Sequence, residues 1–133
     1  MKYFLDTNII AYFMKGKFPG LKEHFETADQ ASIFIPSIVL AEIEYGARKS
    51  HNYEKTKALY NEFIEKFEVV DFSVNEAATY GTVRSQLESL GTPIGPNDMI
   101  IAATALANDA VVVTHNIKEF SRVEGLKVED WTE

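Results

Sequence analysis

Short apolar segments alternate with segments of helical periodicity along the whole chain, and this alternation limits the folds that the chain can adopt. Apolar runs typical of buried strands lie at Tyr3–Leu5, Ile33–Ile35, Val69–Phe72 and Val111–Val113. Segments with helical spacing separate them. Strands joined by helices pair in parallel through right-handed crossovers, with helices on both faces of the sheet. The sequence therefore predicts an α/β fold in three layers around a mainly parallel sheet.

Local signals place the helices between these strands. Pro19 suits the first turn of a helix that runs to about Asp29, and Ser73 with Glu76 forms a capping box for a helix from Val74 to about Leu90. The other helices are expected at Ile9–Met14, from Pro36-Ser37 through Glu42, over the stretch with Leu59, Phe63, Ile64 and Phe67, and over 98–107, where Asn97 or Asp98 is expected to be the cap.

Size and composition are those of one domain with its own core. The chain has 133 residues, of which 46% are apolar and 12% aromatic, so we expect residues 1–133 to form a single domain. The absence of cysteine excludes disulfides, a thiolate zinc site and thiol redox chemistry. No stretch approaches the roughly 20 apolar residues of a membrane span. A soluble, cytoplasmic protein is expected.

Four acidic or amide residues stand where an apolar strand ends or a helix begins. They are Asp6, Glu42, Asp98 and Asn116. In an α/β sheet, strand ends and the adjacent helix starts meet at one crevice, so these side chains are expected to lie together. Oxygen ligands gathered in this way bind Mg²⁺ or Mn²⁺. The sequence therefore predicts a metal site at this edge.

Three of these residues also have a plain structural interpretation. Asp6 and Asp98 are each placed to cap a helix or to interact with its dipole. Asn116 is of a type that is common in turns. At each of these positions the structural role and the ligand role stay open from the residues alone.

Glu42 is harder to explain structurally. Its neighbours three and four residues away on the helix are Ile38, Val39, Tyr45 and Gly46, so it shares a largely apolar face and has no cation within reach. A carboxylate on a buried face needs a partner, and a metal ion is one that would serve. Glu44, by contrast, is expected to pair with Arg48 on the surface.

Charge and the remaining motifs narrow the classes of function. The net charge of −7 argues at first against a polyphosphate partner. Basic patches are nevertheless available at Lys15, Lys17 and Lys22, and at Arg48, Lys49, Lys55 and Lys57, although a solvated face is the more common explanation for any one of these residues. No phosphate-cradling glycine motif or nucleophilic serine motif is present. His115 has no partner motif and is expected to be exposed.

Four segments in order resemble the successive motifs of one family, the PIN-domain ribonuclease toxins of the VapC type. They are Leu5-Asp6-Thr7-Asn8, Leu40-Ala41-Glu42-Ile43-Glu44-Tyr45-Gly46-Ala47, Ile94-Gly95-Pro96-Asn97-Asp98-Met99 and Val113-Thr114-His115-Asn116. The resemblance implies a PIN-like sandwich with four to five strands. It also implies a toxin with Mg²⁺- or Mn²⁺-dependent endoribonuclease activity, a homodimer, and a VapB-type antitoxin that holds the toxin inactive. The implied substrate is tRNA, within it initiator tRNA cut in the anticodon region.

The same resemblance implies roles for individual residues. Asp6, Glu42, Asp98 and Asn116 would be catalytic, with Asp6, Asp98 and Glu42 as metal ligands and with Thr114 and Asn8 near the substrate. Many members of the family carry an aspartate where this chain has Asn116. Glu119, about one turn later, is a candidate to compensate for it.

Two other classes of function were weighed against a nuclease. Asp6-Thr7-Asn8 is similar to the motif of aspartyl-phosphate enzymes, but these need a second aspartate where Asn8 stands. The second alternative is a catalytically inactive PIN module that binds an antitoxin or RNA without cleavage. An acidic pocket further suggests that an antitoxin would insert an Arg or Lys side chain and displace the metal.

Overall fold

The computed structural model describes residues 1–133 and contains one five-stranded sheet in which every neighbouring pair of strands is parallel. The strand order is β3-β2-β1-β4-β5. The strands are β1 (Tyr3–Leu5), β2 (Ile33–Pro36), β3 (Glu68–Val70), β4 (Val111–Val113) and β5 (Lys127–Glu129). The predicted α/β fold with a mainly parallel sheet is therefore confirmed.

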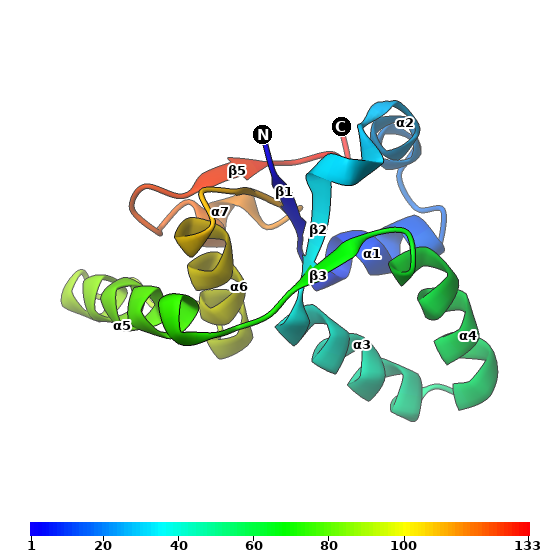
Figure 1. The fold of residues 1–133 in the computed structure, drawn as a ribbon, viewed down its shortest axis with the longest axis horizontal. Helices are drawn as coiled ribbons and strands as arrows, with labels where there is room; N and C mark the ends of the chain where they lie inside the picture. Colours follow the sequence, from blue (N-terminus) through cyan, green and yellow to red (C-terminus); the bar gives the residue numbers. More distant parts are fainter.

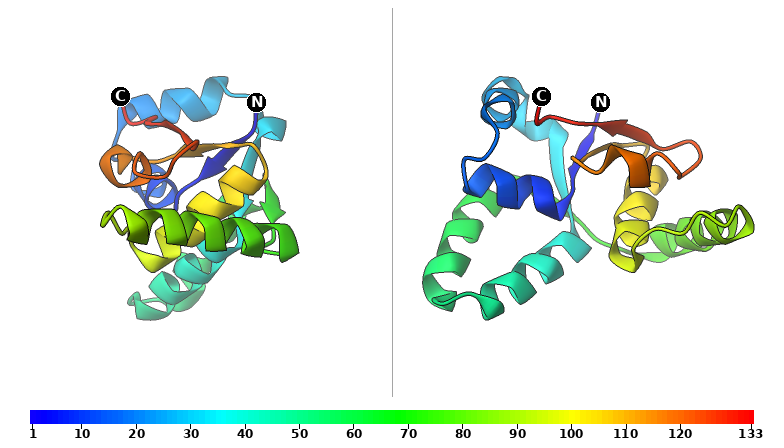
Figure 2. Two further views of the ribbon diagram at one scale, coloured as in Figure 1. Left: turned by 90° about the vertical axis from the view of Figure 1, so that its left-hand side faces the viewer. Right: turned by 180° about the vertical axis from the view of Figure 1, so that it is seen from behind.

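Helices flank the sheet on both sides, as Figure 1 shows, with α5 and α6 together on one side and α1, α2 and α4 on the other. None of the helices is long and apolar enough to cross a membrane. Figure 2 shows that the two termini lie at the same end of the molecule. The helices are α1 (Thr7–Met14), α2 (Pro19–Thr27), the short 3-10 helix η1 (Gln30–Ser32), α3 (Ser37–Lys49), α4 (Tyr53–Ile64), α5 (Val74–Ser89), α6 (Pro96–Ala107) and α7 (Ile117–Phe120).

The two central strands are buried because helices cover both of their faces. Phe4, Leu5, Val112 and Val113 are fully buried, and β1 pairs with β4 in the register Leu5 opposite Val113. Strands covered on both faces have nearly continuous apolar sequences, which is why these two were recognisable. Their shared register places the residues that follow them, Asp6 and Thr114, side by side.

The structure differs from the prediction at the edges of the sheet. β5 and α7 were not predicted. In β5, Lys127-Val128-Glu129 alternates in polarity and leaves only Val128 partly buried. β3 ends at Val70 and not at Phe72, because its last partner is Pro36. Edge strands lack the continuous apolar run on which a sequence-based assignment depends.

Two helix termini test the predicted caps. The capping box at Ser73 and Glu76 is present at the start of α5. The expected cap of α6 is wrong, because Gly95 is the N-cap residue and Pro96 occupies the first turn. Proline at the first position of a helix loses no hydrogen bond, since that N–H has no partner within the helix.

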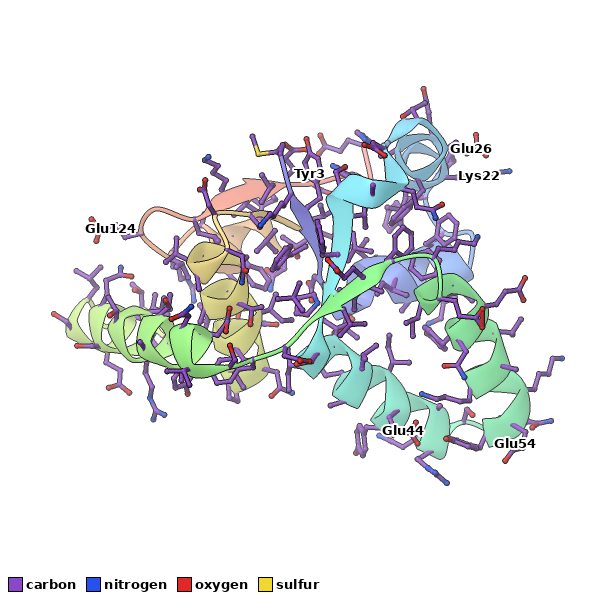
Figure 3. The ribbon with its side chains drawn as sticks, viewed as in Figure 1. Tyr3, Lys22, Glu26, Glu44, Glu54 and Glu124 are labelled. Carbon is purple, nitrogen blue, oxygen red and sulfur yellow. The ribbon has the colours of Figure 1, made fainter.

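The α3–α4 hairpin is joined by a surface network around Glu44, which Figure 3 labels. Arg48 Nε and Lys57 Nζ each lie 2.9 Å from a carboxylate oxygen of Glu44, and the Tyr53 hydroxyl donates to it at 2.8 Å. The hydrogen bonds from Lys57 and Tyr53 lower the pKa of Glu44 to about 2. The predicted pair of Glu44 and Arg48 is confirmed. Exposed pairs of this kind contribute little to stability, so the network mainly orients the two helices.

Candidate functional site

Asp6 lies at the carboxyl edge of the sheet, directly beyond β1. Its backbone N–H donates to the Val113 carbonyl at 3.0 Å, and the Thr114 hydroxyl donates to Asp6 Oδ2 at 2.8 Å. Asp6 occupies the N-cap position of α1, yet its side chain makes no capping hydrogen bond. The carboxylate is turned toward the end of β4 and does not close the helix.

Asp6 is a carboxylate in an unfavourable environment. Its side chain is buried, with 4% of the residue exposed, and burial raises the pKa of Asp6 above its usual value. The Thr114 hydroxyl opposes this shift, while the negative charge of Glu42 adds to it. A buried carboxylate without a cation calls for a compensating charge at this edge.

Glu42 reaches the same edge from α3. The Thr7 hydroxyl donates to one of its oxygens, and Asn97 Nδ2 donates to the other at 3.2 Å. The expected buried face is wrong in part, because Tyr45 is 65% exposed. Neither contact was predicted: Asn97 was expected only as a candidate helix cap and Thr7 had no expected role, although each is adjacent in the chain to a predicted ligand, Asp98 or Asp6.

Asp98 lies in the first turn of α6 and faces the other carboxylates. Burial raises the pKa of Asp98 to about 7, with further contributions from the negative charges of Asp6, Glu119 and Glu42. Asp98 does not cap the helix, since Gly95 holds that position. Four carboxylates therefore share one electrostatic environment: Asp6 beyond the end of β1, Glu42 from α3, Asp98 from α6 and Glu119 from α7.

Glu119, and not Asn116, presents a carboxylate beside Asp98. The backbone N–H of Gly95 and the amide Nδ2 of Asn116 each donate to Glu119 at 2.7 Å, and these contacts, led by Gly95, lower the pKa of Glu119. The negative charge of Glu119 in turn contributes to the raised pKa of Asp98. Asn116 therefore acts as a donor that orients Glu119.

The two residues predicted near the substrate differ in exposure. Thr114 is fully buried, and its hydroxyl accepts from the Asn116 N–H at 2.9 Å while donating to Asp6. Its hydroxyl is thus engaged in holding Asp6. Asn8 is exposed on the first turn of α1. The contact of Asn8 with a substrate stays a prediction.

The chemistry of this carboxylate cluster (Asp6, Glu42, Asp98 and Glu119) fits a hard divalent cation. No Lys, Arg or His forms an ion pair with any of its members, and their mutual repulsion adds to the burial that raises the pKa of Asp98 to about 7. Carboxylate oxygens are the donors that Mg²⁺ prefers. No three acidic or histidine side chains are already grouped around one ion position. Asp6, Glu42 and Glu119 are each turned to a neighbouring donor.

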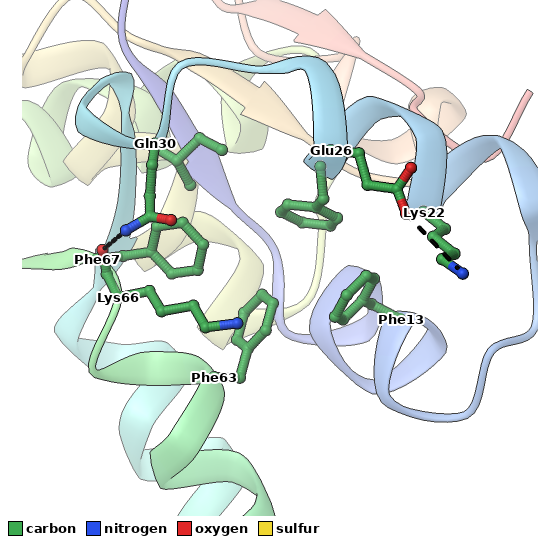
Figure 4. Close-up of a pocket in the computed structure, with 9 residues that line it drawn as sticks. Phe13, Lys22, Glu26, Gln30, Phe63, Lys66 and Phe67 are labelled. Carbon is green, nitrogen blue, oxygen red and sulfur yellow. Dashed lines mark hydrogen bonds and ion pairs between the residues drawn. The ribbon is translucent and has the colours of Figure 1, made fainter.

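An apolar pocket of about 190 Å³ lies elsewhere, between α1, α2 and α4 (Figure 4). Phenylalanine side chains form much of its wall, and Gln30 closes one side by donating to the Lys66 carbonyl at 3.0 Å. None of the four carboxylates lines it. This pocket therefore has no part in the chemistry of the carboxylate cluster.

Known proteins resemble this chain over almost its full length. The family model described as PIN domain matches residues 3–126. A tRNA(fMet)-specific endonuclease VapC from Salmonella typhimurium is 39% identical over 131 residues, which cover 98% of both chains. Ribonuclease VapC2 from Rickettsia felis is 41% identical over 132 residues, again 98% of both.

Solved structures agree with these relatives. The DNA-bound VapBC from Salmonella typhimurium contains a chain that superposes with a TM-score of 0.93 at 39% identity, over 98% of each chain. VapBC2 from Rickettsia felis, bound to a DNA fragment from their promoter, gives 0.92 at 39% identity, over 98% of this chain and 99% of that chain. The family model and the full-length relatives together show that this chain belongs to the PIN-domain family, within its VapC group.

Proposed function

We propose that this protein is the toxin of a toxin–antitoxin pair, a metal-dependent endoribonuclease that hydrolyses an RNA phosphodiester at the carboxylate cluster. The observation that carries the proposal is the meeting of four carboxylates, one beyond β1 and three from helices, none of which forms an ion pair with Lys, Arg or His. Carboxylates clustered in this way repel one another and lower the stability of the fold. Such clusters are therefore typical of catalytic and metal-binding sites. The ribonuclease names of the relatives support the same reading.

The metal would be Mg²⁺, with Mn²⁺ able to replace it, held by Asp6, Asp98 and Glu42. When bound, the ion would activate water for attack on phosphorus and balance the charge that develops on the phosphate oxygens. We assign the fourth carboxylate to Glu119 and not to Asn116, since the Asn116 amide donates to Glu119 at 2.7 Å.

Hydrogen bonds from the surrounding residues orient the carboxylates that would bind the metal. Thr114 holds Asp6 in place from the end of β4, while Thr7 and Asn97 hold Glu42 from two other helices. Gly95 leaves room for this packing, because a Cβ atom there would lie 3.3 Å from Asp98 Oδ2. Oriented by such neighbours, ligands lose less freedom when a cation binds.

The substrate class follows from the relatives. Since a full-length relative at 39% identity is named a tRNA(fMet)-specific endonuclease, we propose tRNA as the substrate and initiator tRNA, cut in the anticodon region, as the first to be tested. The net charge of −7 means that RNA must be met by local basic groups and by the metal.

The proposed partner is a VapB-type antitoxin. Two structural neighbours with 39% identity come from VapBC complexes. We further propose that the toxin is a homodimer, able to join larger toxin–antitoxin assemblies, and that the antitoxin places an Arg or Lys against the carboxylate cluster. Inhibition that persists after the antitoxin's basic residues are replaced by Ala would argue against this last point.

The decisive experiment is cleavage of total tRNA by the purified, antitoxin-free protein in Mg²⁺ or Mn²⁺, with the ends mapped. EDTA and Asp6→Asn should each abolish cleavage, whereas Asp71→Asn, which changes an exposed aspartate, should not. Cleavage that survives Asp6→Asn would refute the site. Absence of cleavage by antitoxin-free protein that is still able to bind the antitoxin would favour the inactive PIN module instead.

A further inference from the structure

A tight turn returns the chain over the end of α1. Gly16 has a φ of +63°, the Lys17 N–H donates to the Tyr12 carbonyl at 3.0 Å, and the Gly16 N–H donates to the Phe13 carbonyl at 3.0 Å. This is the Schellman arrangement, in which glycine adopts the left-handed conformation after a helix. As a result Lys17 Nζ lies 4.9 Å from the centre of the Tyr12 ring, although the Lys17 side chain is exposed.

His115 meets this turn from the end of β4. Its ring centroid lies 6.0 Å from that of Tyr12 and 5.3 Å from that of Phe18. Nδ1 of His115 is 3.0 Å from Asp130 Oδ2 and 3.1 Å from the Thr132 hydroxyl. These contacts fix the ring, yet 48% of the side chain is exposed.

Tyr12, Lys17, Phe18 and His115 therefore form an aromatic rim beside the carboxylate cluster. The rim approaches the cluster through His115, which directly follows Thr114, whose hydroxyl donates to Asp6. Tyr12 lies in the last turn of α1, and Lys17 and Phe18 follow the C-terminal end of that helix, which starts directly after Asp6.

We propose that the aromatic rim binds one nucleotide of the RNA substrate next to the bond that is cut. The base would stack on the half-exposed, fixed ring of His115, and Lys17 would contact a phosphate. Single-stranded nucleic acid is held in this way by aromatic faces combined with cations. The negative charge of the cluster itself repels phosphate. Lys17 forms no ion pair, so its positive charge is available to bind a phosphate of the substrate. The proposal rests on the proposed RNA substrate.

The test compares His115→Ala and Lys17→Gln with two matched controls. His51→Ala removes another exposed histidine, and Lys2→Gln removes an exposed lysine that belongs to neither basic patch. His115→Ala should raise KM for tRNA about tenfold, because stacking on one side chain is worth roughly that factor. Lys17→Gln should raise KM as well, because it removes one contact with a phosphate. kcat should change much less, and both controls should match the wild type. Lys17→Gln should also reduce the salt dependence of binding by about one ion.

A conservative variant and a binding assay separate the possible failures. His115→Phe keeps a stacking ring and should restore most of the affinity, whereas a purely structural role through Asp130 would not be rescued. Binding of tRNA in EDTA, by fluorescence anisotropy, reports on the rim without cleavage. Tight binding that is lost in the rim variants, without any cleavage by the wild type, would support the rim and refute the nuclease.

The opposite outcomes overturn the rim. Normal cleavage with unchanged KM and unchanged affinity in both His115→Ala and Lys17→Gln would refute it while leaving the nuclease intact. Absence of any tRNA binding by the wild type would refute it together with the RNA substrate. Thermal unfolding checks the fold of His115→Ala, and Lys17 is exposed, so at least one variant reports on binding alone.

Discussion

At the scale of single residues, Asp98 is a proposed metal ligand that lowers the stability of the folded protein when it is ionised. The pKa of Asp98 in the folded chain is raised to about 7, mainly by burial and then by the charge of Asp6. The folded state therefore keeps a proton that the unfolded state releases near its ordinary pKa of 3.8, so stability falls as pH rises from about 4 to about 7. Above that range Asp98 is ionised in both states, and the full cost of its buried charge lowers the stability of the folded protein.

Asp98→Asn should therefore stabilise the metal-free protein at pH 8 while abolishing cleavage. The gain should be on the order of 1 kcal/mol, since Asp98 is partly exposed and solvent screens its charge. At about pH 3, below the pKa of Asp98 in both states, both the folded and the unfolded protein hold most of this proton, and the two proteins should unfold at nearly the same temperature. Thermal unfolding of both proteins in EDTA at the two pH values measures this difference. A Tm of Asp98→Asn at pH 8 that is equal to or lower than that of the wild type would contradict the prediction.

Glu119 and Asn116 make separable predictions. If Glu119 supplies the fourth carboxylate, Glu119→Gln should lower kcat/KM about 100-fold, whereas Asn116→Ala, which removes only an orienting donor, should cost about tenfold. Both side chains are at the start of α7, so the comparison is matched. Cleavage assays on the same tRNA decide between them. The reverse ranking would return the ligand role to Asn116.

At the scale of elements, the capping box of α5 links two helices. Glu76 accepts from the Ser73 hydroxyl and backbone N–H, and Asn108 from the end of α6 donates to Glu76 at 3.0 Å. These hydrogen bonds, led by that from the Ser73 hydroxyl, lower the pKa of Glu76 to about 2. The box therefore fastens α5 against α6 as well as closing a helix end.

Ser73→Ala should destabilise the protein by about 1 kcal/mol, the usual cost of losing an N-cap side chain.

Because the folded pKa of Glu76 is depressed, its contribution to stability is present above about pH 4.5 and is lost as pH falls toward 2. Urea unfolding of Glu76→Gln should accordingly show a weaker loss of stability across this acidic range. A dependence on pH as steep as that of the wild type would show that Glu76 is not the group responsible.

At the scale of the whole molecule, metal binding and folding should be coupled. A cation that binds only the folded carboxylate cluster stabilises it by about 2.7 kcal/mol at a hundredfold excess over Kd. The ion competes with the proton on Asp98, so Mn²⁺ should raise the Tm more at pH 8 than at pH 6. Asp6→Asn should remove the effect and Asp71→Asn should retain it. Equal stabilisation of Asp6→Asn would place the ion elsewhere.

The local features of this protein were within reach of its sequence. Apolar runs marked β1, β2 and β4, and the capping box marked α5, because these signals depend on residues only a few positions apart. The order of the four motifs likewise indicated the family. The polar strand β5 and the true cap of α6 were missed, since neither has a distinctive local pattern.

What the sequence determined by itself was therefore the class of fold, most of its elements and the residue types gathered at one edge of the sheet. Tertiary structure alone decided how those residues are used. It joined Thr114 to Asp6 across 108 residues, brought the Gly95 N–H to Glu119, and set His115 against Asp130. Periodicity and capping act along a few residues of backbone, whereas these contacts arise from parallel strands that bring distant segments into register.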